Sequence, residues 1–301
     1  MALALGFLGH ELWRSDAWSL VVIHASEIAL AVAVAIPIYG ICGFLLAEAW
    51  RQLLGPGPAE AHPWRHRALY GRTQIAKYLP GNCFHFVGRQ IMGRRLGHPH
   101  GALAFASLAE TILLLLAAGA LALPVMWSQL IPMLGVLSRW LAAASAGLVV
   151  ALIWRYRRRL RDWWAGLAPG THEQRAGWGA RVLKAGLLHA AFFAITGLLL
   201  WLLAAGLQTP GAGALGLSAA ISVLAMAWCA GFVVPGSSAG VGVREAALVL
   251  ALEPYLVGDG ALVVAVALRL VTTFGDLMLF VLCCIIRFDH VGSARAAHAR
   301  S

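Results

Sequence analysis

Two short stretches of the 301-residue chain place a helix-breaking Pro-Gly pair inside apolar sequence and follow it with an arginine. The first is AKYLPGNCFHFVGRQ at 76–90, and the second is VVPGSSAGVGVRE at 233–245. The arginine stands nine positions after the proline in both, at Arg89 and at Arg244. A helix can restart after each break, and its free N–H groups attract anions. A guanidinium adds a planar fork that matches phosphate, so each stretch predicts an anion site.

The apolar flanks give these stretches their meaning, because the spacing alone is weak. Pro56-Gly57 also has an arginine nine positions later, at Arg65, but it lies in polar sequence. Within a membrane, freed backbone groups find no partner in lipid, so non-helical backbone is tolerated only against protein or a wet cavity. Broken helices in apolar sequence therefore predict a cavity. Paired interruptions of this kind point to the binding site of a transporter.

The expected helix starts decide where each arginine points. A helix that begins at Asn82 has Arg89 seven residues on, close to two turns, so both share a face. The same relation holds between Ser237 and Arg244. Helical side chains lean toward the N-terminus, which brings each guanidinium back toward the free amides. The glycines between Ser237 and Arg244 also allow a later start, which would place Arg244 in the first turn.

Further polar residues complete the expected cavity. From the two stretches themselves we expect substrate-binding side chains at Lys77, Asn82, His85, Arg89, Ser237, Ser238 and Arg244. Charged residues within or beside the apolar runs would hold the cavity open or relay changes in charge, namely Glu110, Glu245, Arg269 and Asp276. A charge at the centre of a membrane helix costs about 2.5 to 3.5 kcal/mol, so these residues should face other helices. Glu110 is expected to pair with Arg269 or with Arg244, and Arg269 and Asp276, seven apart, share a face.

The composition identifies the setting of these residues. The chain is 60% hydrophobic and 12% charged, whereas soluble domains are about 25% charged. We predict an all-α integral membrane protein of about seven to eight helices, with two Pro-Gly-broken or re-entrant segments in two repeat-like halves. The expected spanning helices cover 19–47, 101–123, 137–154, 185–206, 212–233 and 261–286, with a further apolar helix at 241–257.

The distribution of Lys and Arg predicts the topology. They concentrate between Arg51 and Arg95 and between Arg155 and Lys184, and they return from Arg287 onward. The stretches 124–138, 207–216 and 257–262 contain none. Since short cytoplasmic loops collect basic residues, we expect the basic loops and the C-terminus to be cytoplasmic. The net charge of +10 then reflects topology and attraction to anionic headgroups, and not nucleic-acid binding.

One membrane domain is expected to fill residues 1–301. It divides into a first half at 1–154, a basic cytoplasmic loop at 155–184 and a second half at 185–301. Within the first half, we expect the segment 73–98 to be re-entrant, entering and leaving on the cytoplasmic side, because basic residues stand at both of its ends.

Enzymatic signatures are scarce. The sequence has no phosphate-binding loop for ATP and no His-Glu-x-x-His metal helix, so we expect neither a catalytic motif, a metal site nor a cofactor. The five cysteines are scattered and make no disulfide framework. Any transport would therefore be downhill, or coupled to ions or to the membrane potential.

The stretch AKYLPGNCFHFVGR and the stretch PGSSAGVGVREAALVL resemble the transmembrane, flippase-like region of the lysylphosphatidylglycerol synthases and their stand-alone bacterial relatives. SLAETILLLL around Glu110 and ALRLVTTFGD around Arg269 add to the resemblance, which covers about 25–287. Serines at 237 and 238 depart from the family's usual Gly, and nothing corresponds to its soluble aminoacyl-transferring domain. The resemblance implies a location in the bacterial inner membrane and movement of lipids between leaflets.

Three functions follow as hypotheses. The first is translocation of an anionic phospholipid or lipid-linked headgroup, whose phosphate Arg89 and Arg244 would bind. The second is a membrane-embedded transferase acting on a lipid phosphate, with Glu110 or His85 as general base. The third is a non-transporting scaffold that recruits lipid- or envelope-synthesis enzymes. Membrane lipids are the expected partners in each.

Overall fold

The computed structural model describes residues 17–55, 62–81, 83–125, 155, 177–208, 214–234, 238–256 and 259–285. Within these ranges every element is a helix, and no strand occurs. An isolated bridge joins Gln208 to Leu256. The expected all-α class is therefore confirmed.

Four helices in the described part are long and apolar enough to cross a membrane: α3 (Ala25–Leu54), the helix His100–Val125, α8 (Trp178–Ala204) with the 3-10 turn η2 (Ala205–Leu207), and α11 (Gly260–Ile285). With 26 to 30 residues each, they extend about 39 to 45 Å, more than the roughly 30 Å of a hydrocarbon core. They correspond to the expected spans 19–47, 101–123, 185–206 and 261–286, with shifted ends. A short helix, α2 (Ala17–Ile23), precedes α3.

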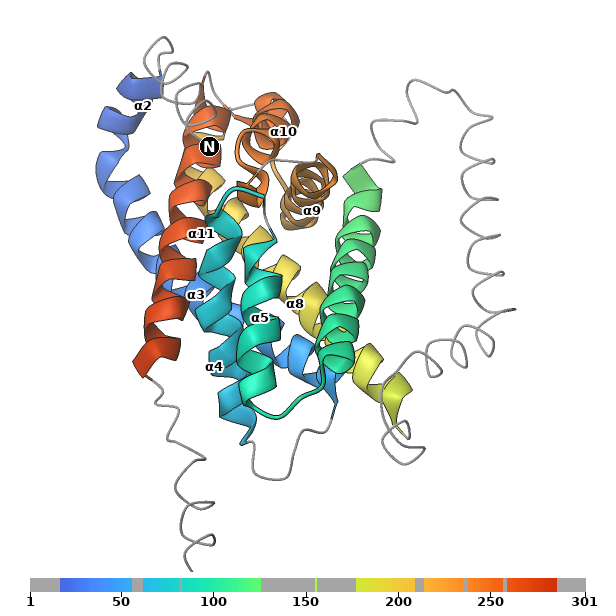
Figure 1. Cartoon of the computed structure of the whole chain (residues 1–301). Coiled ribbons are helices and arrows are strands. Elements are labelled where there is room, and N and C mark those ends of the chain that lie inside the picture. Colours follow the sequence, from blue (N-terminus) through green and yellow to red (C-terminus); the bar gives the residue numbers. More distant parts are fainter. Residues whose placement is uncertain are drawn as a thin grey trace, which may run out of the picture.

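Close helix packing organises the bundle around α3, which lies against both α8 and α11 (Figure 1). A Cβ atom on Gly40 of α3 would lie 2.9 Å from the carbonyl oxygen of Gly275 on α11. A Cβ atom on Gly275 would in turn lie 3.1 Å from the backbone nitrogen of Gly40. Small residues allow this approach, and the van der Waals contact it creates is the main source of helix association in lipid.

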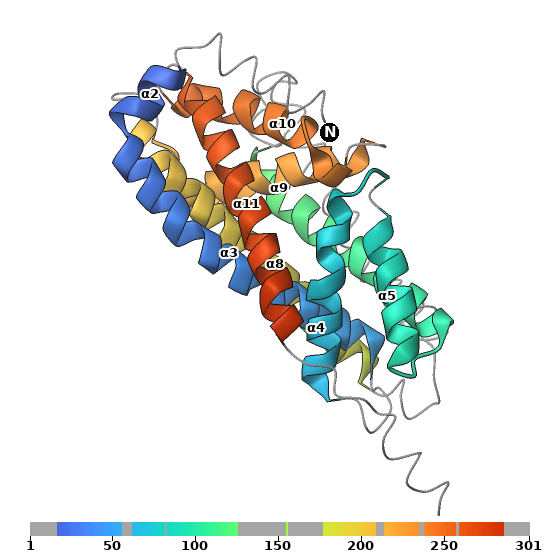
Figure 2. The ribbon, with the colours of Figure 1, turned by 60° about the vertical axis from the view of Figure 1, so that its left-hand side comes forward.

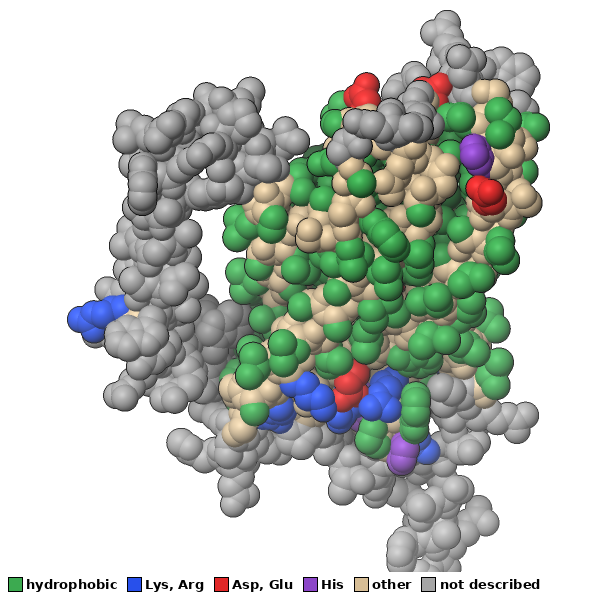
Figure 3. Space-filling view, turned by 180° about the vertical axis from the view of Figure 1, so that it is seen from behind, with side chains coloured by type: hydrophobic (Ala, Val, Ile, Leu, Met, Phe, Trp, Pro, Cys, Tyr) green, Lys and Arg blue, Asp and Glu red, His purple; other side chains and the backbone are tan. Residues whose placement is uncertain are grey.

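The outer surface carries a broad apolar belt with Lys and Arg side chains gathered at one end (Figure 3). Large exposed apolar side chains come from all four long helices, among them Leu30, Leu116, Leu187 and Val281. We call the end where Glu48 binds Arg51, Arg67 and Lys184 the basic end, and the opposite end the far end.

The first Pro-Gly stretch forms the tip of a helical hairpin, which we call hairpin 1. Its outgoing arm is α4 (Pro63–Gln74) with the 3-10 turn η1 (Ile75–Tyr78), and its returning arm is α5 (Phe84–Arg95). The arms lie side by side (Figures 1 and 2). His66 and His98 close its base at the basic end, with 2.7 Å between their Nε2 atoms. The expected re-entrant segment 73–98 thus covers the tip and the whole returning arm of a longer hairpin, and its re-entry into a membrane stays a prediction.

The second Pro-Gly stretch also lies between the arms of a hairpin, which we call hairpin 2. Its arms are α9 (Leu217–Val233) and α10 (Val243–Leu252), with the short 3-10 turn η3 (Ser238–Gly240) between them. The bridge between Gln208 and Leu256, beside the 3-10 turn η4 (Glu253–Tyr255), closes its base at the far end.

This hairpin corrects the expected crossing at 212–233. The helix there has 17 residues, and the chain then turns back instead of continuing to the basic end. The expected apolar helix at 241–257 is the short returning arm. The reversal has a local cause, because Ala239, Gly240 and Gly242 all adopt positive φ angles, which lie outside right-handed helical geometry.

The two hairpins enter the bundle from opposite ends and meet at their tips. The 3-10 turn η1 of hairpin 1 contacts the 3-10 turn η3 of hairpin 2, and Figure 2 shows the two loops next to each other. The chain therefore contains two broken segments in inverted orientation. A repeat relation between whole halves stays a prediction.

Three expected segments cannot be compared with the structure. The span 137–154, residues 156–176 of the basic loop, and the chain from Arg287 onward lie outside the described residues. The end of the expected 155–184 loop is helical, because α8 begins at Trp178 and includes Arg181 and Lys184. Both are long side chains with good helix propensity that can reach the interface from the first two turns of an apolar helix.

Candidate functional site

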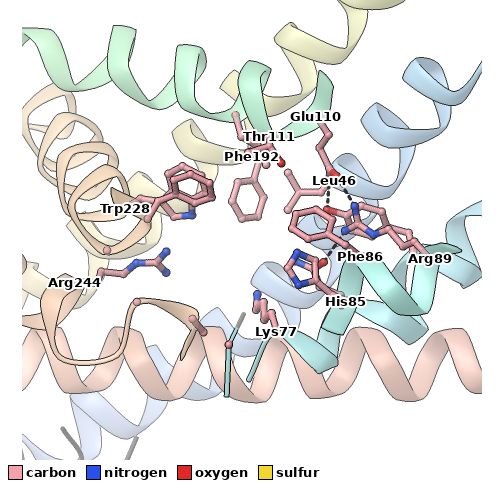
Figure 4. A pocket seen from close by; sticks show the side chains of 18 of the residues that line it. Leu46, Lys77, His85, Phe86, Arg89, Glu110, Thr111, Phe192, Trp228 and Arg244 are labelled. Atoms are coloured by element: carbon pink, nitrogen blue, oxygen red, sulfur yellow. Dashed lines mark hydrogen bonds and ion pairs between the residues drawn. The ribbon is translucent and has the colours of Figure 1, made fainter. Parts of the chain in front are cut away.

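A cavity of about 400 Å³ lies where the two hairpin tips meet (Figure 4). Hairpin 1 contributes residues on both sides of its turn, and hairpin 2 contributes residues from Trp228 to Arg244. Leu46 of α3, Phe192 of α8 and three residues of the helix His100–Val125 close the remaining walls. Both broken segments thus face one shared space, as their sequences predict.

The turn of hairpin 1 follows from its Pro-Gly pair. The chain leaves the 3-10 turn in an extended conformation at Leu79, and Gly81 adopts a φ of +100° that is rare for other residues. The next helix begins at Phe84 with Cys83 at its N-cap, where no side chain caps it. The expected helix start at Asn82 is therefore wrong by two residues, and Asn82 itself lies outside the described residues.

The turn of hairpin 2 uses more positive φ angles. Ala239, Gly240 and Gly242 have φ values of 52°, 72° and 89°. The new helix begins at Val243, the later of the two starts that the sequence allows. Arg244 therefore stands in the first turn of α10. Ser237 and the side chain of Ser238 lie outside the described residues, so their expected role as caps stays a prediction.

Arg89 is held tightly beside the cavity. It is 1% exposed and forms an ion pair with Glu110, which is 2% exposed. It also donates to the side-chain oxygen of Gln74 at 3.0 Å. Its guanidinium lies 4.0 Å from the ring centre of Tyr70, whose hydroxyl donates to the other oxygen of Glu110 at 2.6 Å. The charge of Arg89 is therefore cancelled by protein groups.

The expected partners of Glu110, Arg269 or Arg244, are wrong. Only four residues separate α5 from the helix His100–Val125, so these two helices are neighbours, and a Cβ atom on Gly93 would lie 2.4 Å from the side chain of Leu103. This proximity places Glu110 directly against Arg89.

Lys77 belongs to a second ion pair. Its Nζ atom lies 2.7 Å from an oxygen of Asp276 on α11, and the hydroxyl of Tyr78 donates to that same oxygen at 2.6 Å. Asp276 therefore holds the tip of hairpin 1 against α11. Lys77 lines the cavity, whereas Asp276 lies behind it.

Arg269 performs the equivalent task for hairpin 2. It pairs with Glu245 at 3.2 Å and donates to the carbonyl oxygen of Ala239 at 3.3 Å. Glu245 in turn accepts from the backbone N–H of Gly242 at 2.6 Å. Asp276 and Arg269, seven residues apart on α11, thus anchor one hairpin tip each.

Arg244 is the exception among these cations. Its guanidinium points into the cavity, with Trp228 on one side and Lys77 and His85 opposite (Figure 4). It makes no ion pair or hydrogen bond with any residue that the structure describes, and its Nε atom is buried without a partner. Arg244 as a whole is half-buried, and a cation that is partly removed from water without a counter-charge is costly, so this position is suited to an anion that completes it.

The expected site residues thus fall into three groups. Those that line the cavity are Lys77, His85, Arg89, Glu110 and Arg244. Those that support its walls from behind are Glu245, Arg269 and Asp276. Those outside the described residues, in full or for the side chain, are Asn82, Ser237 and Ser238.

Several residues that line the cavity were not predicted from the sequence. Tyr70 and Gln74 bind the Arg89–Glu110 pair, and their positions about two turns and one turn before Lys77 are a signal that was present in the sequence. Trp228 and Phe232, four residues apart before the second break, stack on each other at the rim. Nothing in the sequence distinguishes Phe192 from other core aromatics.

Comparisons of the chain with protein-family models and with curated proteins find no match.

Proposed function

We propose that this chain is a membrane protein that binds the anionic headgroup of a lipid in the cavity between the hairpin tips and moves it between leaflets. The observation that carries the proposal is the unpaired guanidinium of Arg244, aimed into a cavity that two oppositely oriented broken helices form.

A membrane setting is supported by the four long apolar helices and by the apolar belt with basic residues at one end (Figure 3). Because basic residues collect on the cytoplasmic side, the basic end would face the cytoplasm. Hairpin 1 would then enter from the cytoplasm and hairpin 2 from the outside. This arrangement matches the inverted, broken helices that bind substrates in many transporters.

A lipid is favoured over a soluble anion by the mouth of the cavity. Three lining residues, Gly81, Phe232 and Val234, are exposed, and they mark an opening at the hairpin tips. The neighbouring side chains of Leu79 and Val233 are exposed and apolar, at 50% and 70%. A headgroup could enter sideways through this mouth while its acyl chains stay among such side chains.

The transferase alternative depends on a general base, for which Glu110 and His85 are the candidates, and Glu110 is poorly placed for that role. Both of its oxygens already accept hydrogen bonds, from Tyr70 and from Arg89. Chemical turnover of a lipid phosphate by the purified protein would favour the transferase. Lipid movement without turnover would favour translocation, and cavity variants without any effect would favour the scaffold.

The test is movement of fluorescent phosphatidylglycerol across vesicles that contain the reconstituted protein. We expect the wild type to accelerate it, Arg244→Ala to abolish most of the acceleration, and Arg244→Lys to restore part of it, because lysine keeps the charge and loses the fork. Arg95→Ala is the matched control, since Arg95 is an exposed arginine at the end of α5, away from the cavity. Equal rates for wild type and Arg244→Ala at equal protein levels would refute the proposal.

A further inference from the structure

The cavity contains a surplus of one positive charge. Among the described residues at its wall, the Arg89–Glu110 and Lys77–Asp276 pairs are each neutral in sum, and so is the Arg269–Glu245 pair behind it. The remaining titratable lining groups among the described residues are Tyr70, whose hydroxyl donates to Glu110, and His85, where the nearby cations Lys77 and Arg89 oppose a further charge. Of the described cations at the cavity, Arg244 alone is left to match a ligand.

From this balance we infer that Glu110 determines the charge of the ligand, by cancelling Arg89 so that the site accepts a singly charged phosphodiester and discriminates against a doubly charged phosphomonoester. The inference rests on the proposed function and names the chemistry of its headgroup. A phosphomonoester has a second ionisation near pH 6, whereas a phosphodiester stays a monoanion.

The contacts that hold Arg89 and Glu110 in place explain why a ligand would not displace Glu110. The carboxylate also holds the hydroxyl of Tyr70, and the guanidinium also holds Gln74 and lies on the ring of Tyr70. All of these contacts would have to break at once in a buried site. A second negative charge on the ligand would therefore remain uncompensated, which is unfavourable in a region of low dielectric.

The experiment compares short-chain phosphatidylglycerol with short-chain phosphatidic acid as ligands of the purified protein, by titration calorimetry. For the wild type, raising the pH from 5 to 8 should weaken binding of phosphatidic acid about tenfold relative to phosphatidylglycerol, as the monoester gains its second charge. This comparison needs no variant, so it does not depend on how a variant folds. A ratio independent of pH would overturn the inference.

Charge variants at the pair give a second test. Glu110→Gln frees Arg89 and raises the surplus to two, so the preference at pH 8 should shift about tenfold toward phosphatidic acid. Arg89→Gln combined with Glu110→Gln returns the surplus to one and should restore the wild-type preference. Glu110→Gln with unchanged preference would overturn the inference.

Two arms separate this inference from the proposed function. Arg244→Gln should lose binding of both lipids, and if it bound both like wild type, the proposed site would be wrong. Glycerophosphoglycerol has the same phosphodiester without acyl chains, and it should bind at least about tenfold more weakly than the lipid. Equal binding would overturn the lipid proposal while leaving the charge rule intact.

Discussion

Hairpin 1 and hairpin 2 both place an arginine nine positions after a Pro-Gly pair, and both arginines line the same cavity, yet their surroundings are opposite. Arg89 is the sixth residue of its helix and packs against the helix His100–Val125, where Glu110 neutralises it. Arg244 is the second residue of its helix, directly at the tip, and has no partner in the described part of the chain.

The difference shows how the helix start assigns a role to an arginine. Arg89, in the second turn of α5, faces a neighbouring helix that supplies its counter-charge. Arg244, in the first turn of α10, faces the cavity at the tip, so its charge is available to a ligand. Arg89 is therefore a structural part of the cavity wall, whereas Arg244 is the residue that is available to bind a ligand in the cavity.

Breaking the Arg89–Glu110 ion pair should have the largest effect on stability. Arg89→Ala leaves Glu110 buried without its cation and should lower the free energy of unfolding by about 3 to 5 kcal/mol. Arg89→Leu combined with Glu110→Leu should cost clearly less, because no buried charge remains. Thermal unfolding in detergent measures both. Equal stability of Arg89→Ala and wild type would contradict the assignment.

Removing the ligand-facing arginine should separate binding from stability. Arg244→Ala should weaken headgroup binding about ten- to a hundredfold, since a charge-assisted hydrogen bond is worth about 1.5 to 3 kcal/mol. The free energy of unfolding should fall by less than about 1 kcal/mol, because no protein partner is lost. A large loss of stability in Arg244→Ala would mean that both arginines have a structural role in the cavity wall.

The turn of hairpin 2 should be sensitive to a side chain at Gly240. Its φ of 72° disfavours alanine by about 1 to 2 kcal/mol, and its Cβ atom would lie 3.3 Å from the Cα of Gly231. Gly240→Ala should therefore lower both stability and lipid affinity, because Arg244 follows the turn. Gly186→Ala on α8 is the control, since open space surrounds it and alanine favours helix there. Identical effects at the two sites would contradict the account of the turn.

The smallest expected effect concerns pH at the base of hairpin 1. Burial and the neighbouring His98 lower the pKa of His66 to about 4, from about 6.5 in an unfolded chain. Between these values the unfolded chain binds more protons than the folded protein, so stability should fall as the pH drops from 6.5 to 4. His66→Gln should reduce this slope in unfolding experiments, and the exposed His100→Gln should not. An unchanged slope in His66→Gln would show that the acid loss arises elsewhere.

The sequence by itself determined the local features of this protein. In a membrane, long apolar runs become helices whichever helices they pack against, because their backbone groups must bond within the segment. Pro80-Gly81 ends a helix through a missing N–H and a positive φ, and these are properties of the residues themselves. For the same reason the arginines, Lys77 and His85 could be named in advance as neighbours of one cavity.

Tertiary structure alone decided which charges meet. Whether Glu110 cancels Arg89 or Arg244 depends on which helices are neighbours at that depth, and no periodicity along one helix contains that information. The contact between the two hairpin tips joins segments that lie far apart in the sequence, and no local pattern contains it. Burial makes each pairing decisive, because an unmatched charge is costly inside the bundle. Only the packed fold could therefore show that Arg89 is matched and that Arg244 has no counter-charge among the described residues.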